Sequence, residues 1–183
     1  MSFQGPIPHE TLRQIYSMVA PAAVTIVNTG SECAAQVFVF DVRESGEAEF
    51  ITSLPPHTVN ALHATDRAKQ GLSTLIREIL EGGEADVIAY VTESWTTQIG
   101  AQEVDAGLAR YNELRAAGVT LEHQPGRGEA LVVALHTREG TCASMMPITG
   151  QPRCVTFAPV DLAQIGSPEF TGRMSMNKVG AMS

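Results

Sequence analysis

The chain has 183 residues, 44% of them hydrophobic and only 5% aromatic, so aliphatic side chains must fill most of a domain-sized core. Its 20 acidic and 12 basic residues give a formal net charge of −8, which repels the phosphate backbone of nucleic acids. No run of roughly 18 apolar residues marks a membrane-spanning helix. We therefore expect neither a nucleic-acid partner nor a membrane partner.

The N-terminal residues show no charged leader followed by an apolar segment, so we expect no secretory signal. The cysteines Cys33, Cys142 and Cys154 are odd in number and far apart, unlike a disulfide framework. We expect them to be reduced and mostly buried, and we expect the protein to be cytoplasmic.

The first expected element is a short amphipathic helix over His9–Val19, where apolar residues recur at helical spacing. Pro21 lacks the N–H that a helix interior needs, so we expect it to end this helix. A strand is then expected over Ala23–Val27, followed by a turn at Asn28–Ser31.

A β-hairpin is expected next, with strands over Cys33–Asp41 and Glu47–Thr52 joined at Arg43–Gly46. The longest helix is expected between Thr58 and Gly82, because one apolar stripe runs along its second half. The stripe comprises Leu72, Leu75, Ile76, Ile79 and Leu80.

The second half of the chain favours strands. Ala85–Thr96 begins as a continuous apolar run and is expected to be buried on both faces. Gln102–Ala117 is either a second helix or a loop, since Gly107 interrupts its helical pattern. Three further strands are expected over Glu129–Thr137, Thr141–Ile148 and Cys154–Ala158.

Strands grouped in hairpins favour an α+β fold over a doubly wound one. We expect a mostly antiparallel sheet packed against one long helix and one or two shorter helices. Residues 1–165 are expected to form a single domain. Residues 166–183 carry few core-forming side chains and are expected to be a tail or an arm.

Known catalytic and cofactor motifs are missing. The sequence contains no P-loop, no GxGxxG between a strand and a helix, and no GxSxG elbow. His57 and His63 are six residues apart and have no third ligand nearby in sequence, so we expect no metal site. No cofactor and no catalytic residue are predicted.

Cys142 and His136 resemble a nucleophile and its base. If Glu139–Gly140 forms a two-residue turn, Thr137 faces Cys142 across the hairpin. Because successive residues alternate faces, His136 and Cys142 would then point to opposite sides of the sheet.

The remaining polar group lies at the end of the Ala85–Thr96 strand. Alternation places Glu93 and Trp95, the only tryptophan, on one face, where they could line a pocket. Arg127 and Glu129 could meet Glu93 if their strands are neighbours, and we add His136 as a candidate binding residue. The simpler alternative, which we favour, is a rim salt bridge above a packed Trp95.

Three stretches together carry a resemblance: Val87–Trp95, Pro125–Val132 and Leu135–Pro147. They contain a strand ending in Glu-x-Trp, an Arg-x-Glu-Ala-Leu segment after a proline, and a Thr-Arg-Glu-Gly hairpin. In these features the chain resembles a group of small bacterial and phage proteins of unknown function. The resemblance implies an α+β fold and no established activity, so it assigns no catalytic residue.

Two functions remain open from the sequence. The first is a non-catalytic binding or assembly module, which could be a homo-oligomer or act on a protein partner, because strands apolar on both faces need two covering layers. The second face requires the first helix, another sheet or another subunit. The alternative is a small hydrolase or transferase with a pocket near Glu93, Trp95, Arg127 and His136.

Overall fold

The computed structural model describes residues 5–63, 66–97 and 127–162, together with residue 3 and short pieces at 109–110, 112–114, 116–119 and 123. Within these residues, one antiparallel sheet has the strand order β2-β1-β3-β4-β5-β6. The strands are β1 (Gln36–Val42), β2 (Ala48–Ser53), β3 (Val87–Thr97), β4 (Arg127–His136), β5 (Thr141–Thr149) and β6 (Cys154–Val155). The helices are α1 (His9–Asn28), α2 (Pro56–His63) and α3 (Asp66–Gly82).

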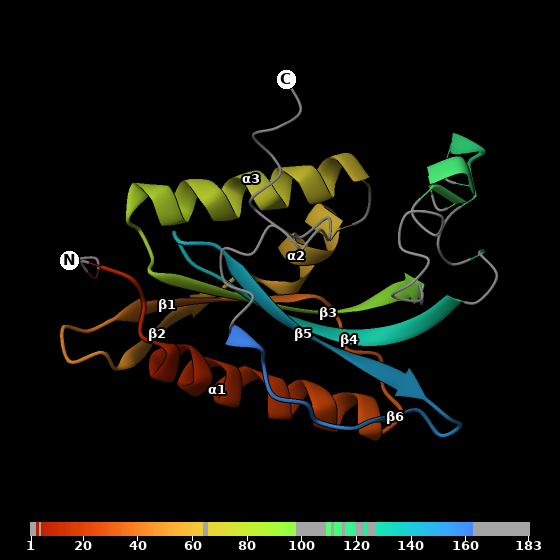
Figure 1. Ribbon diagram of the computed structural model, residues 1–183, viewed down its shortest axis with the longest axis horizontal. Helices are drawn as coiled ribbons and strands as arrows, with labels where there is room; N and C mark the ends of the chain where they lie inside the picture. Colours follow the sequence, from red (N-terminus) through yellow and green to blue (C-terminus); the bar gives the residue numbers. More distant parts are fainter. Residues whose placement is uncertain are drawn as a thin grey trace.

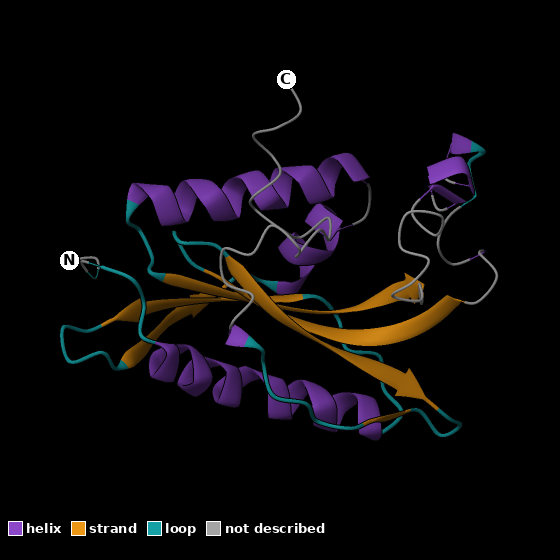
Figure 2. Ribbon diagram, viewed as in Figure 1, coloured by secondary structure: helices purple, strands orange, loops and turns teal. Residues whose placement is uncertain are grey.

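The fold has three layers (Figures 1 and 2). Helix α1 lies along one face of the sheet, and α2 and α3 lie against the other face. Each interface holds its own cluster of buried apolar side chains. The α+β class with an antiparallel sheet is therefore confirmed. The second sheet face is covered by the first helix, so neither another sheet nor another subunit is needed there.

Helix α1 is longer than its sequence suggested. The expectation that Pro21 ends the helix and that Ala23–Val27 forms a strand is wrong, because α1 continues through Pro21 to Asn28. Pro21 lies on the exposed side, where the carbonyl that it leaves unbonded can be solvated. The buried stripe continues past it at helical spacing, and burying that stripe against the sheet outweighs the cost of one proline. Its members are Leu12, Ile15, Tyr16, Val19, Ala20, Ala23 and Val27.

The region expected to be one long helix contains two. Helix α2 ends at His63 and α3 begins at Asp66. Leu72, Ile76 and Leu80 of α3 are buried against the sheet, as their spacing predicts. Helix α3 ends at a left-handed Gly83, whose N–H donates to the Leu80 carbonyl.

The centre of the sheet is its most regular part. The first five residues of β3, 87–91, are at most 1% exposed, which confirms a strand buried on both faces. The expected hairpins β1–β2 and β4–β5 are both present, although β1 begins only at Gln36 and β6 is shortened to two residues.

The β4–β5 turn has two residues, as considered, but they are Arg138 and Glu139 instead of Glu139 and Gly140. Thr137 pairs with Gly140, and Cys142 lies opposite Leu135 instead of Thr137. Since this register differs by two residues, the faces are unchanged. His136 and Cys142 do point to opposite sides of the sheet, as expected.

Two expectations fall largely outside the described residues. Most of the Gln102–Ala117 segment lies outside the described residues, although residues 109–110, 112–114 and 116 are described and are helical. The tail expected at 166–183 lies wholly outside. Among the described helices, none is both long enough and apolar enough to cross a membrane.

Candidate functional site

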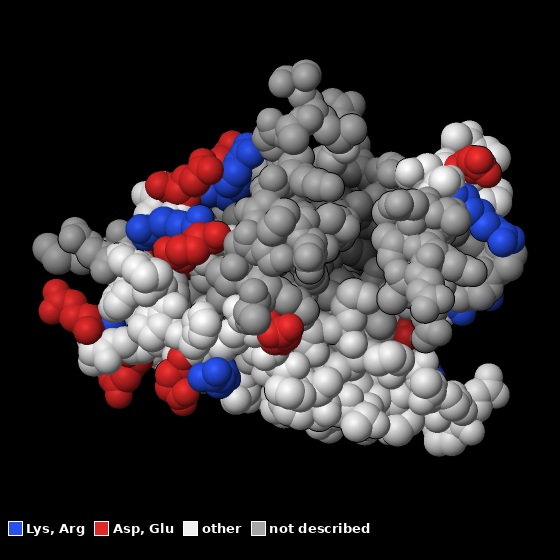
Figure 3. All heavy atoms as spheres, viewed as in Figure 1, with Lys and Arg blue, Asp and Glu red and all other residues white. Residues whose placement is uncertain are grey.

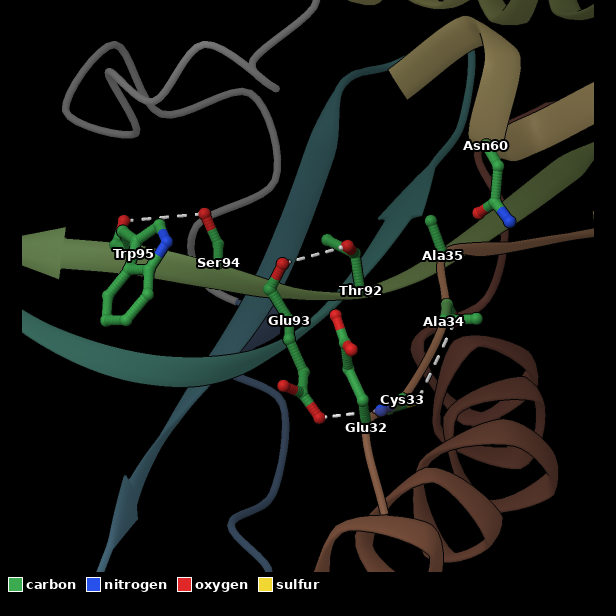
Figure 4. Close-up of a pocket in the computed structure, with 9 residues that line it drawn as sticks. All are labelled: Glu32, Cys33, Ala34, Ala35, Asn60, Thr92, Glu93, Ser94 and Trp95. Atoms are coloured by element: carbon green, nitrogen blue, oxygen red, sulfur yellow. Dashed lines mark hydrogen bonds between the residues drawn. The ribbon is translucent and has the colours of Figure 1, made fainter. Parts of the chain in front are cut away.

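A cleft opens where the β1–β3 ladder stops. Strand β1 pairs with β3 only from Val87 to Val91, whereas β3 continues alongside β4 to Thr97. The chain before β1 runs apart from this continuation of β3 (Figure 4). Between them lies a cavity of about 430 Å³, within the size range of small-ligand sites. Its lining comprises Glu32, Cys33, Ala34, Ala35, Asn60, Thr92, Glu93, Ser94 and Trp95.

Backbone hydrogen bonds fix which groups of β3 face the cleft. The N–H of Leu54 donates to the Val37 carbonyl at 3.0 Å, so Val37 directs its backbone groups toward β2. Its neighbour Gln36 must then direct its groups toward Val91 of β3. Alternation along β3 therefore turns the N–H and C=O of Glu93 and Trp95 in the same direction, away from β4 and into the cleft.

The hydrogen bonds between Thr137 and Gly140 lead to the same result. They direct the backbone groups of Thr137 toward β5, so alternation along β4 directs those of His136 and every second residue before it toward β3. The residues of β3 opposite these are Ile88, Tyr90, Thr92 and Ser94, and Glu93 and Trp95 therefore face away from β4. Side-chain hydroxyls make some of the hydrogen bonds that a neighbouring strand would make with this edge of β3. The Thr92 hydroxyl donates to the Glu93 carbonyl at 3.0 Å, and the Ser94 hydroxyl donates to the Trp95 carbonyl at 3.4 Å. No strand in the described part of the chain pairs with this edge of β3.

Glu93 holds the two walls of the cleft in place. Its carboxylate accepts a hydrogen bond from the Cys33 N–H at 2.6 Å and forms an ion pair with Arg153. Arg153 also pairs with Glu129 at 3.1 Å and donates to the Ser31 carbonyl at 3.3 Å. The hydrogen bond with Glu93 raises the pKa of Arg153. These bonds connect β3, β4, the segment before β1 and the turn before β6.

Trp95 and Arg127 form the outer end of the site. The Arg127 guanidinium lies over the Trp95 ring, 5.1 Å from its centroid, in a cation–π contact. Figure 4 shows Trp95 and Glu93 on one side of β3 and Ser94 on the other, as alternation predicts. Glu93 and Trp95 thus line the same cleft, and Arg127 is next to it.

His136 does not lie near the cleft with Glu93, Trp95 and Arg127. It lies opposite Ile88, five residues along β4 from the partner of Glu93, which is a separation of about 17 Å. Its side chain is on the α3 face, where Nδ1 is 2.9 Å from the Thr141 hydroxyl. Burial lowers the pKa of His136 to about 4, so the ring is neutral near pH 7.

The buried cysteines are poor nucleophiles. Burial, together with the nearby Glu93 carboxylate, raises the pKa of Cys33 to about 11. Burial raises the pKa of Cys142 to about 12. Both thiols are therefore protonated at neutral pH, and the thiolate is the reactive form. The described residues contain no group of three side chains suited to a metal ion.

The sequence prediction missed half of this site. It considered that Arg127 and Glu129 could both meet Glu93. Glu129 is joined to Glu93 through Arg153, and Arg127 lies over Trp95. Arg153 belongs to a turn 60 residues from Glu93, so no local pattern connects the two. Glu32 and Asn60 were also missed, because neither follows a recognisable motif.

No family model, curated protein or solved structure matches this chain. The chemistry of the cleft must therefore be judged from its own geometry.

Proposed function

We propose that the protein is a non-catalytic binding module whose ligand site is the cleft between residues 32–35 and β3. One observation carries the proposal: β3 turns backbone donors and acceptors that no described strand pairs with into a 430 Å³ cavity, which an aromatic ring also lines. Such an edge offers directional hydrogen bonds to a ligand without any rearrangement of the sheet.

The alternative of a small hydrolase or transferase has less support. The described residues that line the cleft include no base beside a nucleophile. The pair formed by His136 and the Thr141 hydroxyl is buried and lies about 17 Å along the sheet from Glu93. Glu93 itself already accepts bonds from Cys33 and Arg153. A binding role needs only the surfaces and backbone groups that line the cleft.

The test uses the only tryptophan as a reporter, since Trp95 lines the cleft. A panel of capped short peptides, nucleosides and neutral sugars would be screened by Trp fluorescence and by native mass spectrometry. We expect at least one class to shift the emission and add mass. Ala34→Phe, which fills the exposed wall of the cleft, should remove both signals.

Ala22→Phe is the matched control, because Ala22 is an exposed alanine on α1 outside the cleft. Signals that survive both substitutions equally would place the ligand elsewhere. Turnover of a panel compound at the cleft, lost in Ala34→Phe alone, would favour the enzyme alternative.

One further surface favours self-association as a second role. No charged residue occurs from Gln14 to Ser31, although the whole chain carries −8. Figure 3 shows charged side chains near the start of α1 and an uncharged surface over the rest of it. Met18 is 48% exposed there. Because two copies of an acidic protein repel each other least at uncharged surfaces, we infer that a second copy would dock on α1.

Sedimentation of the full chain tests this second role. We expect a dimer that Met18→Glu converts to a monomer. Met145→Glu is the control, since Met145 is 55% exposed on the opposite face of the molecule. A monomeric wild-type protein at high concentration would refute the idea.

A further inference from the structure

We propose that the ligand of the cleft is an extended peptide segment that adds to β3 as a strand and carries a basic side chain toward Glu32. This inference rests on the proposed binding function and specifies its ligand. Four features of the cleft support it: the spacing of its backbone groups, the length of its edge, the character of its two sides, and its charge.

The backbone groups have the spacing of a strand partner. Glu93 and Trp95 are two residues apart, so their outward N–H and C=O groups repeat at about 6.8 Å. An extended peptide presents matching groups on alternate residues, and small rigid ligands do not. The hydroxyl bonds to the Glu93 and Trp95 carbonyls leave room for a second donor, since a carbonyl oxygen has two lone pairs.

The length of the edge also suits a short peptide. Beyond the last β1 pair, β3 continues over the six residues from Thr92 to Thr97, a distance of about 17 Å. The remainder of the sheet needs no change, because β4 already holds this part of β3 along its other side. The added strand would continue the line of β1 beyond its first residue, Gln36.

The two sides of the edge differ in character. Trp95 lies on the α1 face of β3, and the hydroxyls of Thr92 and Ser94 lie on the other face (Figure 4). Successive side chains of an added strand alternate between these faces. An apolar residue would contact the indole ring, and its neighbours would meet the hydroxyls and Asn60. Main-chain bonds would give the affinity and these contacts the sequence preference.

The charge of the cleft selects a basic residue. Glu93 and Glu129 share the single guanidinium of Arg153, so this cluster remains net negative. On the opposite wall Glu32 is exposed and makes no ion pair with any of the described residues. A lysine or arginine in the peptide would complement this excess of carboxylate, and an acidic side chain would be repelled.

The experiment measures binding of defined peptides to the full chain by Trp fluorescence and calorimetry. The probe is a capped hexapeptide of alternating valine and threonine with one central lysine, and its partner carries glutamate at that position. We expect the lysine peptide to bind at least tenfold more tightly. In Glu32→Gln the preference should fall to within about twofold. Glu44→Gln, at an exposed site in the β1–β2 turn, should leave it unchanged.

Backbone methylation tests strand addition itself. N-methylation at one alternate set of positions should abolish binding, because those N–H groups would face β3. Methylation of the other set should change affinity less than threefold. Equal losses for both sets, or no loss for either, would overturn strand addition.

The outcomes separate this inference from the binding function. If no peptide binds but another class in the panel does, and Ala34→Phe removes that signal, the peptide is wrong and the binding site stands. If no class of ligand binds at all, both proposals fail. A peptide that binds equally with lysine or glutamate would overturn the charge selection alone.

Discussion

At each end of the β1–β3 ladder a carboxylate accepts a backbone hydrogen bond and pairs with an arginine, yet one end is closed and the other is open. At one end Asp86 accepts a hydrogen bond from the Val42 N–H at 2.9 Å and pairs with Arg138 at 3.0 Å. At the other end Glu93 accepts from the Cys33 N–H and pairs with Arg153. Each carboxylate bonds a backbone N–H outside the part of β1 that pairs with β3, and each pairs with one arginine.

The difference lies in side-chain length and burial. The Asp86 side chain is 1% exposed, so that end is closed. Glu93 is one methylene longer and 13% exposed, and it holds the incoming chain away from the edge of β3. A carboxylate that replaces a backbone hydrogen bond of the ladder can therefore either hold the two strands together or leave a cleft between them. The closed end should be important for stability, and the open end for binding.

Replacing Asp86 should cause the largest effect. In Asp86→Ala the Val42 and Phe3 N–H groups lose their acceptor and Arg138 loses its partner. Leaving a buried N–H without its acceptor costs about 1–3 kcal/mol, and two N–H groups lose theirs together with the ion pair, so we expect a loss of about 3–5 kcal/mol in urea unfolding. Glu44→Ala, at an exposed turn, is the control and should change stability by less than about 0.5 kcal/mol. Equal stability of the two variants would contradict the importance of the closed end.

Low pH should reduce the stability contributed by the closed end of the ladder. His136 lies opposite Ile88 near the closed end and is 1% exposed. Its folded pKa of about 4 is below the usual value near 6.5, so the unfolded chain binds the proton more readily between these pH values. Its contribution is fully present above pH 6.5 and is lost as the pH falls toward 4.

We expect that protonation of His136 removes about 2–3 kcal/mol of stability between pH 7 and pH 4.5. His136→Gln removes this titration, so the variant should lose less stability than the wild type over the same interval. Urea unfolding of both proteins at the two pH values measures the difference. An identical pH dependence would show that His136 is not buried in its neutral form.

The sequence predicted the regular helices and strands better than it predicted the cleft. Strand β3, the two hairpins and the buried stripe of α3 follow from hydrophobic periodicity, because burial there repeats along one element. The opposite faces of His136 and Cys142 were also predicted, although the turn lies one residue earlier than supposed, since the pairing then shifts by two residues and preserves the face. Pro21 misled the prediction of α1, because tertiary burial of Ala23 and Val27 outweighed a local rule.

The cleft depends on contacts that no local pattern encodes. Glu93 and Trp95 could be proposed because they end a strongly apolar strand. Arg153 could not, since its approach to Glu93 requires the order of the strands and the path of the turn before β6. The late start of β1, at Gln36 instead of Cys33, was also missed. Cys33–Ala35 continues the apolar pattern, yet the bond between Glu93 and the Cys33 N–H draws this segment off the ladder.

Replacing Glu93 should cause a smaller loss of stability and a larger loss of binding. Glu93→Ala removes the acceptor for the Cys33 N–H and one of the two carboxylates on Arg153, which should cost about 1–2 kcal/mol in urea unfolding. Glu93→Gln keeps an oxygen for the Cys33 N–H, so it should lose less than about 1 kcal/mol. If Glu93 holds the cleft open, ligand affinity should fall at least tenfold in the alanine variant and less in the glutamine variant. A loss in Glu93→Ala as large as that in Asp86→Ala, with unchanged affinity, would mean that both ends of the ladder serve stability alone.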